Sequence, residues 1–123
     1  MLFRSDRQKA PLVTVECSES VERAARLMTE RAYSQLPVVS DGRLVGSVNE
    51  GHLYAEIVKS PDVLHGPVEA IMQPAFPFVD ISTPVELLST MIKPGNAAVL
   101  VRDFKTDKTY IITRSDLIRV LGS

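Results

Sequence analysis

The sequence predicts a mixed α/β (α+β) fold in which two copies of a β-α-β-β-α unit pack with pseudo-twofold symmetry. One observation is an internal repeat. Residues 15–28, VECSESVERAARLM, and residues 79–92, VDISTPVELLSTMI, share a β run, a Ser/Thr-containing cap and a helix in one register. A second observation is that each copy continues with two β runs and a closing helical segment. Neither copy covers enough apolar surface alone, so we expect the two copies to pack together.

The first helix of each copy follows a capping region. Ser18 provides the cap in the first copy, and Ser82 and Thr83 provide it in the second, where Pro84 suits the first helical turn. The apolar side chains of both helices recur at the spacing of a stripe that faces a core. These are Val21, Ala24, Ala25 and Met28 in the first copy, and Val85, Leu88, Met91 and Ile92 in the second.

The two β runs of each copy are expected to form a hairpin. In residues 35–50, QLPVVSDGRLVGSVNE, the runs flank an Asp-Gly dipeptide, which tolerates the positive φ values of a tight turn. Residues 97–116, AAVLVRDFKTDKTYIITRSD, contain a longer polar loop, in which Asp103 and Asp107 are predicted to be solvated. The helices that close the two copies are HLYAEIVK and LIRVLGS.

These elements divide the chain into four segments. Residues 1–11 form a solvated lead-in, residues 12–60 the first copy, residues 61–75 a linker with a short helix, and residues 76–123 the second copy. The linker is recognised from SPDVLHGP, which interrupts the helical pattern, and from VEAIM, which suits one helical turn.

The composition argues against several classes of protein. Lys+Arg 14 and Asp+Glu 15 give a net charge of -1, and no basic cluster is interleaved with aromatic residues, so nucleic acid is not an expected partner. Cys17 is the only cysteine, which excludes an internal disulfide. No apolar run suggests a signal peptide or a membrane span. We therefore expect a soluble cytoplasmic protein that does not interact with membranes.

Neither a metal centre nor a catalytic site is expected. His52 and His65 lie apart, with no cysteine or carboxylate at ligand spacing around them. No nucleophile is accompanied by a base at a motif distance, so the sequence does not predict an enzyme.

The strand-to-helix junction at Thr113 admits two interpretations. A β run stops at Thr113, and Asp116 follows three residues later, which is the arrangement of a capping box. The repeat places Asn49 and His52 at the equivalent positions of the first copy. Asn49 can cap a helix, whereas His52 offers no carboxylate, so a helix can begin here without Asp116. Asp116 therefore either completes a cap or binds a ligand.

These residues resemble a known family, the tandem CBS domain pair or Bateman module, from about Leu12 to Leu121. The resemblance is carried by the repeat, the LPVV strand, the Gly-x-Val strand of VGSVNE and the strand that ends in Thr-x-x-Asp. The segments SQLPVV, VGSVNE, VEAIMQPAFPFVD, AVLV and IITRSDL are also similar to the C-terminal regulatory region of bacterial cystathionine β-synthase-type proteins. In those proteins the region follows a pyridoxal-phosphate (PLP) catalytic domain, which the sequence does not contain.

The resemblance implies a site for an adenosyl ligand in a cleft between the two copies. Ligands of such modules include AMP, ATP and S-adenosylmethionine. An ionised Asp116 could accept hydrogen bonds from both hydroxyls of a ribose, and Thr113 could hold the ribose or its 5′ substituent. Flanking residues and an apolar slot for adenine are implied at Ile112, Ser115, Leu12, Val13, Tyr33 and Ser34.

The expected ligand is S-adenosylmethionine rather than AMP or ATP. Relatives that hold nucleotides usually place a basic residue before the AVLV strand, where this sequence has Asn96 and Ala97. A phosphate would therefore lack a charged partner, unless Arg114 or Lys93 supplied one.

The expected function is that of a non-catalytic sensor, without a cofactor of its own, that regulates an attached or partner enzyme. The resemblance makes a PLP-dependent enzyme of the cystathionine β-synthase type one such parent. A structural or dimerisation module without a working ligand site is the alternative. Either role is compatible with a homodimer, because amphipathic helices not used within the chain need a partner.

Overall fold

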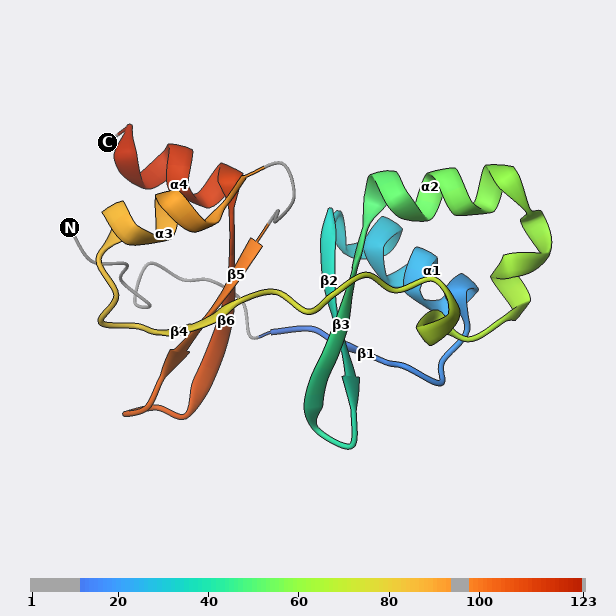
Figure 1. Cartoon of the computed structure of the whole chain (residues 1–123), viewed down its shortest axis with the longest axis horizontal. Helices are drawn as coiled ribbons and strands as arrows, with labels where there is room; N and C mark the ends of the chain where they lie inside the picture. Colours follow the sequence, from blue (N-terminus) through green and yellow to red (C-terminus); the bar gives the residue numbers. More distant parts are fainter. Residues whose placement is uncertain (1–11, 94–97, 123) are drawn as a thin grey trace. The chain divides into compact units, whose positions relative to one another are not determined.

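The computed structural model describes residues 12–93 and 98–122. It has the predicted α+β fold, with two three-stranded sheets that have the same topology (Figure 1). Residues 13–75 form one unit, and the described residues from Phe76 onward belong to a second. The pseudo-twofold packing of the two units stays a prediction.

The first unit contains a sheet of strand order β1-β2-β3. Strand β1 runs parallel to β2, and β2 is antiparallel to β3. The predicted tight turn joins β2 to β3, and its residues Asp41 and Gly42 have φ values of 50° and 79°. The elements are β1 (Val15–Glu16), α1 (Val21–Arg31), β2 (Gln35–Ser40), β3 (Arg43–Asn49) and α2 (Glu50–Lys59).

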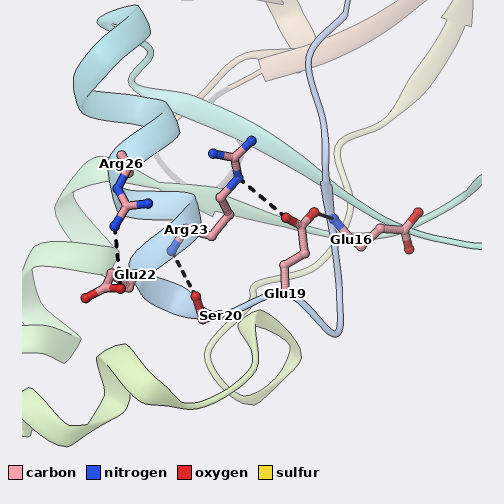
Figure 2. A network of polar contacts seen from close by, with 6 residues as sticks. All are labelled: Glu16, Glu19, Ser20, Glu22, Arg23 and Arg26. Atoms are coloured by element: carbon pink, nitrogen blue, oxygen red, sulfur yellow. Dashed lines mark hydrogen bonds and ion pairs between the residues drawn. The ribbon is translucent and has the colours of Figure 1, made fainter.

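Helix α1 is capped by Ser20 and not by Ser18 as predicted. The Ser20 side chain accepts a hydrogen bond of 3.1 Å from the backbone N–H of Arg23 (Figure 2). Ser18 lies instead in the turn between β1 and α1, which the Glu19 carboxylate closes by accepting from the N–H of Glu16. Because two serines stand in this segment, the spacing alone could not decide between them.

The core of the first unit lies between α1, the sheet and the segment that follows α2. The stripe predicted on α1 is buried at Val21, Ala24 and Met28. Burial of such side chains contributes roughly 1.5–3 kcal/mol for each large one. The buried set is Val15, Val21, Ala24, Leu27, Met28, Leu36, Val38, Val48, Leu53, Val68 and Ile71.

Residues 61–75 begin with the 3-10 helices η2 (Pro61–His65) and η3 (Val68–Ala70). Residues 66–74 of this segment, here called the strap, are hydrogen-bonded to the first unit. Val68 is fully buried, and its N–H donates to the carbonyl of Glu19 at 2.8 Å. Ser47 in β3 and Gln73 exchange two backbone hydrogen bonds, each of 2.8 Å. The strap therefore extends the first unit beyond its sheet and helices.

The second unit repeats the order of elements, with a parallel β4-β5 pair and an antiparallel β5-β6 pair. Helix α4 begins directly after β6, and α2 likewise begins directly after β3, so both start earlier than predicted. The elements are β4 (Phe78–Asp80), α3 (Val85–Met91), β5 (Ala98–Asp103), β6 (Lys108–Thr113) and α4 (Arg114–Leu121). Their buried core is Val85, Leu88, Val99, Val101, Ile112 and Leu117.

The predictions for three residues of the second unit, Pro84, Asp103 and Asp107, can be compared with the structure. Pro84 precedes α3 as its N-cap residue and provides no side-chain cap bond. Asp103 ends β5 and is largely buried, with its carboxylate accepting from the N–H of Lys105, so the prediction of a solvated Asp103 is wrong. Asp107 is exposed as predicted and forms an ion pair with Arg102.

The strap approaches β3 so closely that Gly46 has no room for a side chain. A Cβ atom there would lie 2.5 Å from Sδ of Met72 and 2.9 Å from the carbonyl oxygen of Gln73. We expect Gly46→Ala to displace the strap and to lower the free energy of unfolding by about 1–3 kcal/mol. Urea denaturation followed by circular dichroism measures this loss.

Gly51→Ala is the matched control. A Cβ at Gly51, in α2, would make an ordinary contact of 3.6 Å with Oδ1 of Asn49. Alanine favours a helix over glycine by up to about 1 kcal/mol, so this variant should be neutral or more stable. Equal stability of the two variants would contradict the close packing of the strap.

Candidate functional site

The strand-to-helix junction of the second unit carries the predicted capping box. Thr113, the last residue of β6, donates from its N–H to Oδ2 of Asp116 at 2.9 Å. The Thr113 hydroxyl lies 3.1 Å from the same oxygen, to which it donates. The side chains thereby fix the first turn of α4, because they satisfy groups that have no partner within the helix.

Asp116 is almost fully buried although it carries a carboxylate. Its exposed fraction is 4%, whereas its partner Arg119 has a side chain that is 69% exposed. The guanidinium Nη2 of Arg119 donates to Oδ1 of Asp116. Arg119 was not predicted as a site residue, although its spacing of three residues from Asp116 along a helix is the signal by which such pairs are found.

Ile112 and Ser115 flank this junction in different ways. The Ile112 side chain is fully buried in the core of the second unit, next to Thr113 in β6. Ser115 is exposed in the first turn of α4. The structure thus brings four predicted site residues together, with Ile112 anchoring the strand end and Ser115 facing outward.

The other predicted site residues are divided between the units. Val13, Tyr33 and Ser34 belong to the first unit, whereas Leu12 is grouped with the second. The Ser34 carbonyl accepts from the N–H of Glu50 at 3.0 Å, so Ser34 lies at the junction of its own repeat. A cleft that joins these residues to Thr113 and Asp116 stays a prediction.

The equivalent junction of the first unit is held by the strap. Asn49 accepts from the N–H of His52 at 2.8 Å and donates from Nδ2 to Oε1 of Gln73 at 2.5 Å. Nε2 of His52 lies 3.0 Å from the carbonyl oxygen of Ile71, and 3.8 Å from the carboxylate of Glu56. Because a carbonyl only accepts, the imidazole must donate from Nε2. The predicted cap is therefore present, and both side chains also fasten the strap.

The structure describes only some of the residues that bear on phosphate binding. Asn96 and Ala97 lie outside the described residues. Lys93 and Arg114 are both exposed, the latter as the first residue of α4.

Within the described residues, no group of three or more His, Cys, Asp or Glu could hold a metal ion. None of the described helices is both long and apolar enough to cross a membrane.

These features are similar to those of known CBS-domain proteins. Residues 7–59 match the family model of the CBS domain. This segment is therefore similar to the CBS domain, and the fold of the described residues is that of CBS-pair proteins. No curated protein sequence matches the chain.

Three solved structures illustrate the similarity. CBSX2 from Arabidopsis thaliana is 28% identical, with 92% of this chain and 89% of that chain covered and a TM-score of 0.68. CBSX2 has also been solved in complex with AMP. The CBS domain pair of MJ0100, solved with 5′-methylthioadenosine and S-adenosyl-L-methionine, is 24% identical with coverages of 95% and 93% and a TM-score of 0.76. ATU1752 from Agrobacterium tumefaciens is 20% identical, with both coverages 94% and a TM-score of 0.81.

Proposed function

We propose that this chain is a non-catalytic regulatory module that binds an adenosyl ligand through Thr113 and Asp116. Two structural relatives support the ligand class, because CBSX2 was solved with AMP and MJ0100 with two adenosyl compounds. The regulated protein would be an attached or partner enzyme, and the sequence resemblance favours a PLP-dependent enzyme of the cystathionine β-synthase type. The single Cys17 and the composition fit a cytoplasmic setting.

The observation that carries this proposal is a difference between the two repeats. Both junctions form a side-chain cap, but only the second adds a nearly buried carboxylate, that of Asp116. In the first repeat the equivalent His52 contacts the strap at Ile71 instead. A carboxylate is the side chain best suited to accept hydrogen bonds from two ribose hydroxyls. The proposal therefore assigns one ligand site, in the second repeat.

A structural or dimerisation module is the second candidate function. Its support is that Asp116 already accepts hydrogen bonds within its own helix cap and from Arg119. Large apolar side chains are also exposed on helices of both units, as a protein interface would require. Such a module would need no ligand at all. Regulation, in contrast, requires a ligand that favours one arrangement of the chain over another.

The first test replaces Asp116 by asparagine, which keeps an acceptor for the N–H of Thr113 and removes the charge. Each charge-assisted hydrogen bond contributes roughly 1.5–3 kcal/mol, so affinity for AMP or S-adenosylmethionine should fall at least about tenfold. Isothermal titration calorimetry measures the affinity, and thermal unfolding confirms that the fold survives.

Asp103→Asn is the matched control. Asp103 is also largely buried in the second unit, and its carboxylate also accepts from a backbone N–H, that of Lys105. This variant should bind like the wild type. Unchanged affinity in Asp116→Asn would remove Asp116 from the site, and the absence of binding by any adenosyl compound would favour the structural module.

The second test concerns the choice of ligand, for which we propose S-adenosylmethionine. The reason is the sequence at Asn96 and Ala97, which provides no basic side chain before β5 for a phosphate. Each missing charge-assisted contact costs a nucleotide roughly 1.5–3 kcal/mol. Competition binding against a fluorescent adenosyl probe should therefore rank S-adenosylmethionine above AMP and ATP. At least tenfold tighter binding of either nucleotide would overturn this choice.

The third test concerns self-association, because we propose that the chain forms a homodimer through its helices. Exposed apolar side chains lie on α2 at Tyr54 and Val58, and on α4 at Ile118 and Leu121. Multi-angle light scattering should give twice the monomer mass of 13.6 kDa. An Ile118→Asp, Leu121→Asp double variant should weaken the dimer, because it places charges in an apolar interface.

Phe104→Asp is the control for this test. Phe104 is 68% exposed in the loop between β5 and β6, at the opposite end of β6 from α4. Its substitution should leave the dimer intact. A monomer mass for the wild type throughout the micromolar range would refute the proposed homodimer.

A further inference from the structure

Most of the hydrogen-bonding capacity of Asp116 is already used in this structure. Oδ2 accepts from both the N–H and the hydroxyl of Thr113, and Oδ1 accepts from the guanidinium of Arg119. A carboxylate offers about four lone-pair sites, and at least three are therefore occupied. A ribose presents two adjacent hydroxyls, which need two acceptor sites. The diol cannot be bound by Asp116 until one of the existing donors withdraws.

Arg119 is the donor that can withdraw at the lowest cost. Its side chain is 69% exposed, so water can replace the hydrogen bond that it loses. The Thr113 hydroxyl belongs to the capping box at the end of β6, and turning it away from Asp116 would weaken the first turn of α4. The N–H of Thr113 belongs to the backbone and cannot rotate away. The guanidinium of Arg119 is therefore the donor that a ribose hydroxyl would replace on Asp116.

We propose that Arg119 competes with the ribose for Asp116 and thereby sets the affinity of the site. This inference rests on the proposed function, because it assumes that Asp116 binds the ribose. Arg119 is then a specificity-determining residue that acts through Asp116. It weakens the binding of every ribose ligand and disfavours those that cannot displace it. The ion pair also keeps the buried carboxylate partnered when no ligand is bound.

The test uses adenosine, which is uncharged, so that attraction between Arg119 and a phosphate cannot mask the competition. Arg119→Gln keeps the length of much of the side chain and removes the charge. Because the guanidinium of Arg119 is largely exposed to water, it binds Asp116 weakly, and adenosine should bind roughly two- to fivefold more tightly to the variant than to the wild type. Isothermal titration calorimetry on the full chain measures both affinities.

Salt and a second ligand supply independent readouts. Because salt screens the pair of Arg119 and Asp116, raising the NaCl concentration should tighten adenosine binding to the wild type and leave Arg119→Gln unaffected. A 2′-deoxyadenosine ligand presents one hydroxyl fewer, so the gain from Arg119→Gln should be smaller for it. A merely structural role for Arg119 would produce neither the salt response nor the difference between the two nucleosides.

Arg26→Gln is the matched control for the loss of one positive charge. Arg26 also pairs with a carboxylate on its own helix, that of Glu22 at 3.6 Å, and both side chains are 54% exposed (Figure 2). This pair belongs to α1 in the first unit. Adenosine affinity in Arg26→Gln should equal that of the wild type at every salt concentration.

The outcomes separate this inference from the proposed function. Tighter binding by Arg119→Gln, together with loss of binding by Asp116→Asn, supports both. Equal or weaker binding by Arg119→Gln, with binding still lost in Asp116→Asn, overturns the competition and leaves the proposed site intact. If adenosine binds neither the wild type nor Arg119→Gln while S-adenosylmethionine binds the wild type, the competition is overturned alone. If no adenosyl compound binds, or if adenosine binds Asp116→Asn as well as the wild type, both proposals fail.

Discussion

The two halves of this protein depend on one local interaction, the side-chain cap that turns a strand directly into a helix. Asn49 caps α2 and Thr113 caps α4, each as the last residue of the strand that precedes its helix. No loop intervenes, so the cap fixes both the end of the sheet and the direction in which the helix leaves it. The backbone groups at these points are satisfied by side chains within the same short segment. A polar side chain placed one turn into either helix is therefore held in a defined position.

The position one turn into the helix is where the two repeats diverge. His52 contacts the carbonyl of Ile71 and so holds the strap, whereas Asp116 holds the end of its own strand and pairs with Arg119. One scaffold thus supports two uses, an internal fastening in the first repeat and a nearly buried carboxylate in the second. Burying a carboxylate is costly unless it is hydrogen-bonded, and the cap and the guanidinium provide those bonds.

The repeated fold was predictable from the sequence because strand, cap and helix recur in the same register. Strand pairing confirms that register, since Val15 lies beside Val38 as Val79 lies beside Val101. The capping box at Thr113 was also predictable, because it depends only on local spacing. Ser20 was missed because neighbouring serines offer the same chemistry. The fastening of His52 to the strap was missed because it joins residues 19 positions apart, and no periodicity reports such a contact.

The two copies also differ in the residue at the position of Gly46, which has no side chain. Gly46 pairs with Val38, and the corresponding pair in the second unit is Tyr110 with Val101. Tyr110 is 6% exposed, and an aromatic side chain at the equivalent Gly46 would collide with Met72 and Gln73 of the strap. The two halves are thus duplicates in backbone but are not interchangeable as parts. A chain in which the second half preceded the strap would place a tyrosine ring against Met72 and Gln73. The repeat that the strap packs against must therefore carry glycine at this position.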